Sequence, residues 1–243
     1  MRKINVAPLQ ELDYKTMEEV KKLRTSISFL DPSVKVINIT SAVGKEGKSM
    51  ISFWLAHTIA ASGKKVILLD ANLRKKEKLN IFEIFKEHEE TIKETKTHDK
   101  KKQKDKDKVE VQSKENFLTG RTLKKYLMGN AHRDEIIFSS NIDNMYFILS
   151  GHESEKPSEL LSKDAFGHLI SYLREEYDYI IIDTPAVGEV TDGVITAKQS
   201  DGSILVVEPG VVPYELAQKV KEQLEKSQTK VLGVVMNKVV AGI

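Results

Sequence analysis

One segment, residues 35–62, constrains the fold of this chain more than any other. An apolar run at 35–40 leads into Ala-Val-Gly-Lys-Glu-Gly-Lys-Ser at 42–49, and a second apolar run follows at 49–62. The eight-residue pattern is a phosphate loop whose first position accepts Ala for Gly, in the strand-before and helix-after context that the pattern requires. Its backbone N–H groups converge on a phosphate at the positive end of the helix. The sequence therefore predicts a nucleotide-binding P-loop.

The residues of this loop have distinct expected roles. Lys48 is placed to reach the β- and γ-phosphate oxygens, and the Ser49 hydroxyl to ligate Mg²⁺. Lys45 occupies a position that is commonly Gly, and a positive φ there would carry strain of about 1 kcal/mol. Alternatively the loop bends differently and Lys45 points to solvent, and a third reading makes it an extra phosphate contact. The expected nucleotide contacts in the loop are Gly44, Lys45, Glu46, Gly47, Lys48, Ser49 and Met50.

Two aspartates each close an apolar, strand-like run. Asp70 follows Val-Ile-Leu-Leu, and Asp183 follows Tyr-Ile-Ile-Ile. Because ligands of open parallel sheets bind at such strand ends, Ser49, Asp70 and Asp183 are predicted to converge on one metal and phosphate site. One hydroxyl and one or two carboxylates suffice for Mg²⁺, which keeps several waters. The competing reading is that each aspartate only caps a helix or forms a turn.

Short apolar runs alternate with helical patterns along the rest of the chain. This alternation predicts an α/β fold with a mostly parallel central sheet flanked by helices. Helices are expected at 14–30, 49–62 and 158–177, and a last helix carries Leu216, Val220 and Leu224 at four-residue spacing. The six expected strands span residues 35–40, 65–69, 145–149, 179–182, 203–207 and 231–235.

Composition bounds the domain organisation and the partners. A length of 243 residues with 40 % apolar content predicts one domain over residues 1–243. Residues 86–116 hold ten lysines and nine acidic residues, which predicts a solvated, mobile insertion, or alternatively a polyanion or membrane-surface contact by its lysine-rich centre. The lack of cysteine fits the cytoplasm, and no apolar run is long enough to span a membrane. A net charge of +2 is too small to attract nucleic acid by long-range electrostatics.

Several segments carry a family resemblance in the right order. They include Leu-Arg-Thr-Ser-Ile at 23–27, the loop at 40–49, Leu-Leu-Asp-Ala-Asn-Leu-Arg at 68–74, and three further segments at 156–161, 177–185 and 232–238. Together they resemble the bacterial tyrosine kinases of capsule and exopolysaccharide synthesis, from the same broad group as the ParA and MinD ATPases. The resemblance spans most of the chain and implies a P-loop NTPase of the deviant Walker type.

The resemblance implies an ATP- and Mg²⁺-dependent protein-tyrosine kinase of the autophosphorylating type. Lys48, Asp70 and Asp183 would be catalytic: Lys48 would neutralise the transferring phosphate, and Asp70 would sit nearest the tyrosine hydroxyl. The implied metal ligands are Ser49, Asp70 and Asp183. Asn237, after the last strand, is carried over as an adenine contact.

The resemblance also implies partners. The protein would form a homo-oligomer, act on protein tyrosines and regulate capsular or exopolysaccharide synthesis and export. It would be cytoplasmic, and a membrane adaptor of the polysaccharide co-polymerase type would recruit it to the inner face of the membrane, with no nucleic-acid partner. The oligomerisation residues would be Glu18, Lys21 and Arg24, where Lys21 replaces an arginine and loses its planar bidentate contact.

Two departures from the family pattern motivate an alternative function. Asn72 replaces the second aspartate of the 68–74 segment, which removes a charge near the metal. The sequence ends at Ile243, and its seven tyrosines form no terminal cluster like the family's tyrosine-rich tail. The alternative is a catalytically weak, ATP-binding regulatory scaffold of the same machinery. A ParA- or MinD-type switch is a third reading, but Val43 stands where such proteins carry a signature lysine.

Overall fold

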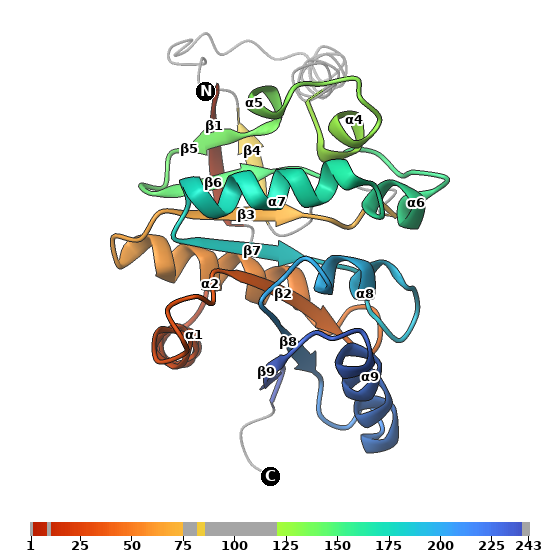
Figure 1. The fold of residues 1–243 in the computed structure, drawn as a ribbon. Helices are drawn as coiled ribbons and strands as arrows, with labels where there is room; N and C mark the ends of the chain where they lie inside the picture. Colours follow the sequence, from red (N-terminus) through yellow and green to blue (C-terminus); the bar gives the residue numbers. More distant parts are fainter. Residues whose placement is uncertain (1, 9–10, 75–81, 86–120, 240–243) are drawn as a thin grey trace, which may run out of the picture.

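A computed structural model describes residues 2–8, 11–74, 82–85 and 121–239 (Figure 1). A nine-stranded sheet runs through the molecule in the order β4-β1-β5-β6-β3-β7-β2-β8-β9. Neighbouring strands pair in parallel, except for β1 with β4 and β5 with β6. The strands are β1 Arg2–Pro8, β2 Val36–Ser41, β3 Val66–Asp70, β4 Phe82–Phe85, β5 Phe138–Ser140, β6 Met145–Ile148, β7 Tyr179–Asp183, β8 Gly202–Val207 and β9 Val231–Met236.

Helices cover both faces of the sheet. Figure 1 shows α7 crossing in front of the strands and α2 behind them. The helices are α1 Tyr14–Ser28, α2 Lys48–Ala61, α4 Leu123–Leu127, α5 Arg133–Ile136, α6 Pro157–Leu161, α7 Asp164–Glu176, α8 Asp192–Ala197 and α9 Tyr214–Lys226. This arrangement confirms the predicted α/β fold with a mostly parallel sheet.

The central strands alternate between two apolar cores, as a strand covered on both faces requires. On β3, Val66 and Leu68 join the core that includes Phe53 of α2, whereas Ile67 and Leu69 join the core that includes Phe166 of α7. A third, smaller core lies under α8 and α9. Because consecutive residues of the same strand belong to different cores, a register slip of one residue would disturb both, so the strand ends are firmly positioned.

The six expected strands are all present, but three further strands were not predicted. β5 has three residues and β4 has four, lengths at which apolar periodicity carries little signal. β1 lies parallel to β5, and β5 turns back antiparallel against β6. The predicted insertion at 86–116 lies outside the described residues.

The prediction of one continuous helix at 158–177 is wrong, because the chain forms α6 and then α7. The N–H of Ser162 closes α6 by donating to carbonyl groups of that helix, and Lys163 adopts an extended backbone with ψ 148° before α7 begins. Leu161, Leu169 and Leu173 nevertheless pack in the same core, so the four-residue spacing identified the buried face correctly.

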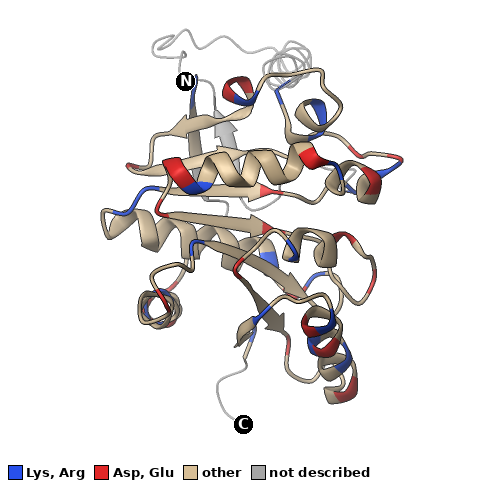
Figure 2. Cartoon of the chain, viewed as in Figure 1, with Lys and Arg blue, Asp and Glu red and all other residues tan. Residues whose placement is uncertain are grey.

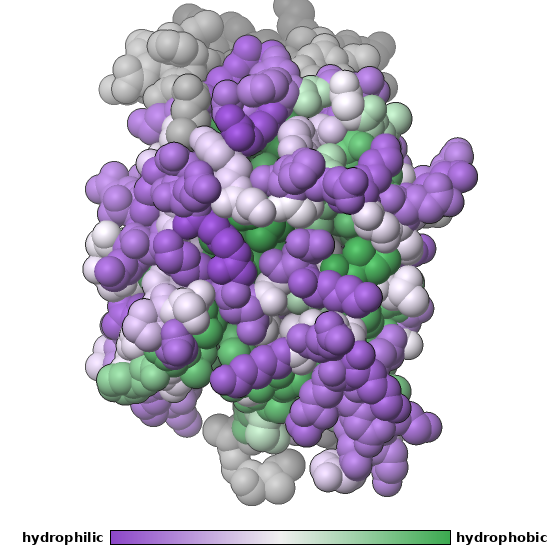
Figure 3. Space-filling model, viewed as in Figure 1, coloured by the Kyte–Doolittle hydropathy of each residue, from purple (hydrophilic) through white to green (hydrophobic). Residues whose placement is uncertain are grey.

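The face drawn in Figure 3 is largely hydrophilic, and hydrophobic residues show as smaller areas among the hydrophilic ones. Figure 2 shows acidic positions at the tips of β3 and β7, at one edge of the sheet. None of the helices in the described part of the chain combines the length and hydropathy of a membrane-spanning segment.

Candidate active site

The phosphate loop connects β2 to α2, as the sequence predicted. Gly47 caps the helix in the left-handed region with φ +86°, and a Cβ there would lie 2.1 Å from Nδ2 of Asn237. Lys45 also has a positive φ, +65°, so the predicted strained backbone is confirmed at this residue. The Lys45 side chain is exposed. Two positive-φ residues within three positions turn the loop sharply toward the helix N-terminus.

Hydrogen bonds from two strands brace the loop from behind. The buried carboxylate of Glu46 accepts from Val43 N at 2.8 Å and from Glu208 N, after β8, at 2.9 Å. Asn237, after β9, donates from Nδ2 to the Glu46 carbonyl at 2.8 Å. Lys238 donates to the Lys45 carbonyl at 2.8 Å and pairs with Glu208 at 2.6 Å. The side chain of Glu46 is therefore engaged inside the protein, and Asn237 lies directly against the loop.

The ammonium group of Lys48 lies within the curve of the loop. The residue is 8 % exposed, and Nζ donates to the Ser41 hydroxyl at 2.7 Å and to the Val43 carbonyl at 3.3 Å. A buried cation at the N-terminal end of a helix forms a local positive site in a chain of nearly balanced charge. A polyphosphate is the natural ligand for this arrangement.

The structure brings the three residues predicted at strand ends together. β3 and β7 are neighbours in the sheet, and Asp70 is directly paired with Asp183 in their register. Both aspartates are 2 % exposed. Ser49, in the first turn of α2, donates its hydroxyl proton to Asp183 Oδ2 at 2.5 Å. Two carboxylates and a hydroxyl thus lie at the end of the phosphate loop.

These oxygen atoms fit a magnesium ion. Mg²⁺ prefers hard oxygen ligands, and it is usually held by one or two carboxylates, waters and phosphate oxygens rather than by a complete protein cage. Ser49 and Asp183 supply a hydroxyl and a carboxylate in mutual contact. Within the described ranges, no three acidic or histidine side chains gather as a metal centre, so phosphate and water would complete the coordination.

Sequence reasoning missed the residue that orients Asp70. Ser150 follows β6, the strand on the other side of β3, and its hydroxyl donates to Asp70 Oδ2 at 2.7 Å. The backbone N–H of Asn72 donates to Asp70 Oδ1 at 3.1 Å. Each carboxylate oxygen therefore accepts a fixed hydrogen bond. The usable signal was the position of Ser150 just after an apolar strand.

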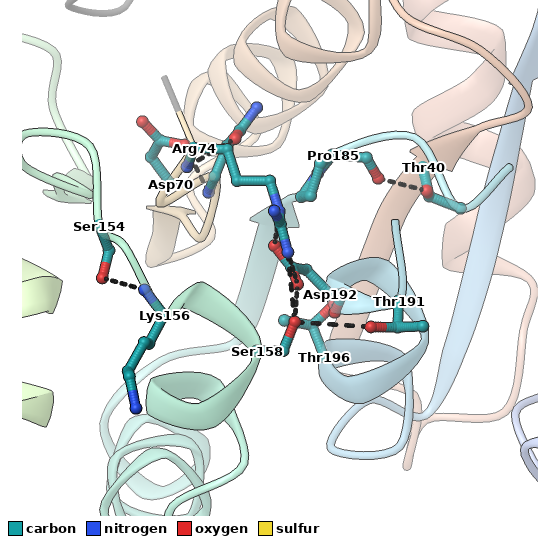
Figure 4. A network of polar contacts seen from close by, with 11 residues as sticks. Thr40, Asp70, Arg74, Ser154, Lys156, Ser158, Pro185, Thr191, Asp192 and Thr196 are labelled. Atoms are coloured by element: carbon teal, nitrogen blue, oxygen red, sulfur yellow. Dashed lines mark hydrogen bonds and ion pairs between the residues drawn. The ribbon is translucent and has the colours of Figure 1, made fainter. Parts of the chain in front are cut away.

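A second missed group ties the segment after β3 to α6 and α8 (Figure 4). Arg74 binds the fully buried Asp192 through two nitrogens, Nε to Oδ2 at 2.7 Å and Nη2 to Oδ1 at 3.0 Å. Ser158, from α6, donates to the same Asp192 Oδ1 at 2.6 Å. The hydrogen bonds that Arg74 donates to the Asp192 carboxylate raise the pKa of Arg74. Segments far apart in sequence thus meet on one buried carboxylate.

The loop after β7 packs tightly on the phosphate loop. Val187 N donates to the Ser41 carbonyl at 2.9 Å, and a Cβ at Gly188 would lie 2.1 Å from the carbonyl oxygen of Ala42. Only a glycine permits this approach. The next residue, Glu189, accepts a hydrogen bond at Oε1 from Gly44 N at 2.6 Å. Sequence reasoning did not anticipate this contact.

The predicted oligomerisation residues lie on α1, apart from the phosphate loop. Lys21 pairs with Glu18 at 2.7 Å, and both side chains are substantially exposed. Arg24 is half-buried and donates from Nη1 to the Thr58 carbonyl of α2 at 3.1 Å. One member of the motif thus joins α1 to α2 within the subunit, while the other two remain on the surface.

Comparison with known proteins gives concordant results. A sequence family described as an AAA domain matches residues 34–234. The tyrosine-protein kinase CpsD of Streptococcus agalactiae serotype III is 34 % identical over 225 residues, which cover 93 % of this chain and 83 % of that protein.

Solved structures show the same fold. The kinase domain of the Escherichia coli tyrosine kinase ETK aligns with a TM-score of 0.76 at 24 % identity, over 97 % of this chain and 82 % of that one. The septum site-determining protein MinD of Pyrococcus horikoshii OT3, complexed with Mg-ADP, aligns with a TM-score of 0.60 at 21 % identity, over 86 % of this chain and 72 % of that one.

Proposed function

Because this chain belongs to the AAA-domain family and, within the P-loop ATPases, to the bacterial tyrosine kinases, we propose that it is an ATP- and Mg²⁺-dependent protein-tyrosine kinase of the autophosphorylating type. Residues 1–243 form one P-loop kinase domain in this proposal. The observation that carries it is the meeting of Ser49, Asp70 and Asp183 at the end of the phosphate loop.

The proposed reaction transfers the γ-phosphoryl group of ATP to a tyrosine hydroxyl. The tyrosine oxygen bonds to the γ-phosphorus, the bond from that phosphorus to the β–γ bridging oxygen breaks, and ADP leaves. Asp70 accepts the phenolic proton late in the transfer, since the reference pKa of tyrosine is about 10. Lys48 neutralises charge on the phosphoryl oxygens, while the N–H groups of the loop hold the β-phosphate. Positioning therefore matters more than the basicity of Asp70.

We assign the Mg²⁺ ligands to Ser49 and Asp183, with Asp70 as a further carboxylate on the same side. When bound, the ion would offset the negative charge that develops during phosphoryl transfer. The contact between Ser49 and Asp183 supports the first two assignments. For Asp70 the support is its register pairing with Asp183 and its orientation by Ser150.

The nucleotide would contact the loop residues 44–50, and Asn237 would lie near the adenine. The hydrogen bond from Asn237 to the Glu46 carbonyl supports this assignment, because it keeps the amide beside the loop. The backbone N–H of Lys45 would contact the phosphates, and its exposed side chain would make an additional phosphate contact.

Assembly and location follow from the family in this proposal. The protein forms a homo-oligomer through the α1 surface that carries Glu18, Lys21 and Arg24. A membrane adaptor of the polysaccharide co-polymerase type recruits it to the cytoplasmic face of the membrane, where it phosphorylates protein tyrosines. Through this activity it regulates capsular or exopolysaccharide synthesis and export.

The experiment that tests this function measures transfer of label from γ-³²P-ATP with Mg²⁺ to a tyrosine-containing acceptor peptide, in the presence of an adaptor fragment. Matched peptides with Phe or Ser in place of Tyr are the controls. Label on the tyrosine peptide alone is expected. Tight ATP binding without any label would contradict the kinase assignment and favour the alternative, a nucleotide-gated regulatory scaffold of the same machinery.

Asn72 is the observation that favours the scaffold alternative, and it yields a direct prediction. Its side chain accepts from Arg74 N at 3.2 Å, two residues beyond Asp70. Asn72→Asp is expected to raise the phosphotransfer rate about fivefold, because it restores a charge worth about 1 kcal/mol beside the metal. The same label assay measures this change.

The matched control for that variant is Asn130→Asp, which makes the same chemical change in an exposed turn. It is expected to leave the rate unaltered. If Asn72→Asp also leaves the rate unaltered, position 72 tolerates either residue and gives no support to the scaffold.

A further inference from the structure

The loop between β7 and α8 places a carboxylate on the phosphate loop. Glu189 Oε1 accepts from Gly44 N at 2.6 Å, a short hydrogen bond to a charged acceptor. The approach is close enough that a Cβ added at Gly44 would lie 3.2 Å from the same oxygen. Gly44 and Glu189 are both exposed, so this contact lies at the mouth of the loop.

The backbone fixes where Glu189 begins. Val187 N is bonded to the Ser41 carbonyl, and Glu189 N closes a turn onto the Ala186 carbonyl at 3.1 Å. Between them, Gly188 approaches the Ala42 carbonyl more closely than any other residue could. The backbone thus fixes the Cα of Glu189 close enough for its carboxylate to contact the phosphate loop. The side-chain rotamer then determines whether the contact forms.

We propose that Glu189 is an internal competitor of the nucleotide phosphates and sets the affinity of the loop for ATP and ADP. This inference rests on the proposed nucleotide binding at the same loop. A carboxylate and a phosphate both accept backbone N–H groups and both carry negative charge. The Gly44 N–H cannot donate a full hydrogen bond to the Glu189 carboxylate and to a phosphate at once, and the two anions repel each other. Glu189 therefore swings to solvent as the phosphates bind.

The test compares dissociation constants for ATP and ADP, measured by isothermal titration calorimetry with Mg²⁺ at low ionic strength. Glu189→Gln keeps the shape of the side chain and removes its charge. We expect it to bind both nucleotides roughly fivefold to tenfold more tightly than the unmodified protein, the range for an exposed charged hydrogen bond. Raising the salt concentration should narrow this difference, because screening weakens the repulsion.

Glu175→Gln is the matched control. Glu175 is exposed near the end of α7, before β7 begins, and so lies at the opposite edge of the sheet from Asp183. Glu175→Gln changes the net charge by the same amount as Glu189→Gln and should leave the dissociation constants for ATP and ADP unaltered. An equal gain in affinity from this control would overturn the proposal, because net charge alone would then explain the effect.

Two other outcomes would also overturn the proposal. If Glu189→Gln binds nucleotide as the unmodified protein does, or more weakly, Glu189 is a brace that supports the loop and not a competitor. If neither variant nor the unmodified protein binds ATP or ADP, the proposed nucleotide site itself is wrong. The first outcome removes only this inference, so the two failures are distinguishable.

Discussion

Lys48→Met is expected to lower the rate of phosphotransfer by about a thousandfold, as the loss of a preorganised electrostatic contact does in other enzymes. Lys48 is 8 % exposed, and its ammonium lies inside the curve of the loop, where it faces the proposed phosphates. Methionine keeps most of the apolar stem and removes the charge, together with the hydrogen bonds that Nζ donates to Ser41 and Val43. The label assay with a tyrosine peptide measures the rate, and circular dichroism verifies the fold.

The matched control for this change is Lys198→Met, an exposed lysine at the end of α8. It should retain the rate of the unmodified protein. If Lys48→Met retained more than about a tenth of the activity, a loss below about 1.4 kcal/mol, Lys48 would not stabilise the transferring phosphate.

Arg74→Met is expected to lower the free energy of unfolding by about 2–3 kcal/mol, because it leaves a buried carboxylate without its cation. Asp192 is fully buried, and after the change it would keep the hydrogen bond that Ser158 donates to Oδ1 but would lose its cation. Since Arg74 is partly exposed, the loss should fall below that of a fully buried pair. Urea unfolding followed by tryptophan fluorescence measures it.

An ion pair on the surface with the same nitrogen–oxygen distance provides the control. Lys22 lies 2.7 Å from Glu19, as Arg74 lies from Asp192, but both side chains are mostly exposed. Lys22→Met should leave the free energy of unfolding almost unaltered, because water screens an exposed ion pair. The double variant, Arg74→Met with Asp192→Asn, should lose about 1–2 kcal/mol less free energy of unfolding than the two single variants lose in sum. Strict additivity would show that the two side chains are not coupled.

Local sequence patterns predicted the parts of this protein that local physics determines. The P-loop, the six predicted strands and the strand ends that carry Asp70 and Asp183 follow from apolar runs and from the residues that close them. The positive φ of Lys45 followed from the usual glycine at its position. Each of these features depends on residues that are close together in the sequence.

The contacts that were missed join distant segments. Ser150 meets Asp70 from 80 residues away, and Glu189 meets Gly44 from 145 residues away. No spacing rule connects such positions, because their meeting depends on which strands become neighbours in the sheet. The break between α6 and α7 was missed for a different reason, since the apolar spacing continues across it.

The order of the strands also has a consequence for how the protein acquires its site during folding. The hydrogen bond from Ser49 to Asp183 closes 134 residues of chain, and β3 reaches β7 only after a comparable stretch. Closing such a long loop costs entropy before the contacts that it brings together can offset that cost, so these pairings slow folding. An emerging chain therefore exposes the residues of the phosphate loop well before β7 and the segments that hold the loop in place exist. We expect the metal site to form late in folding.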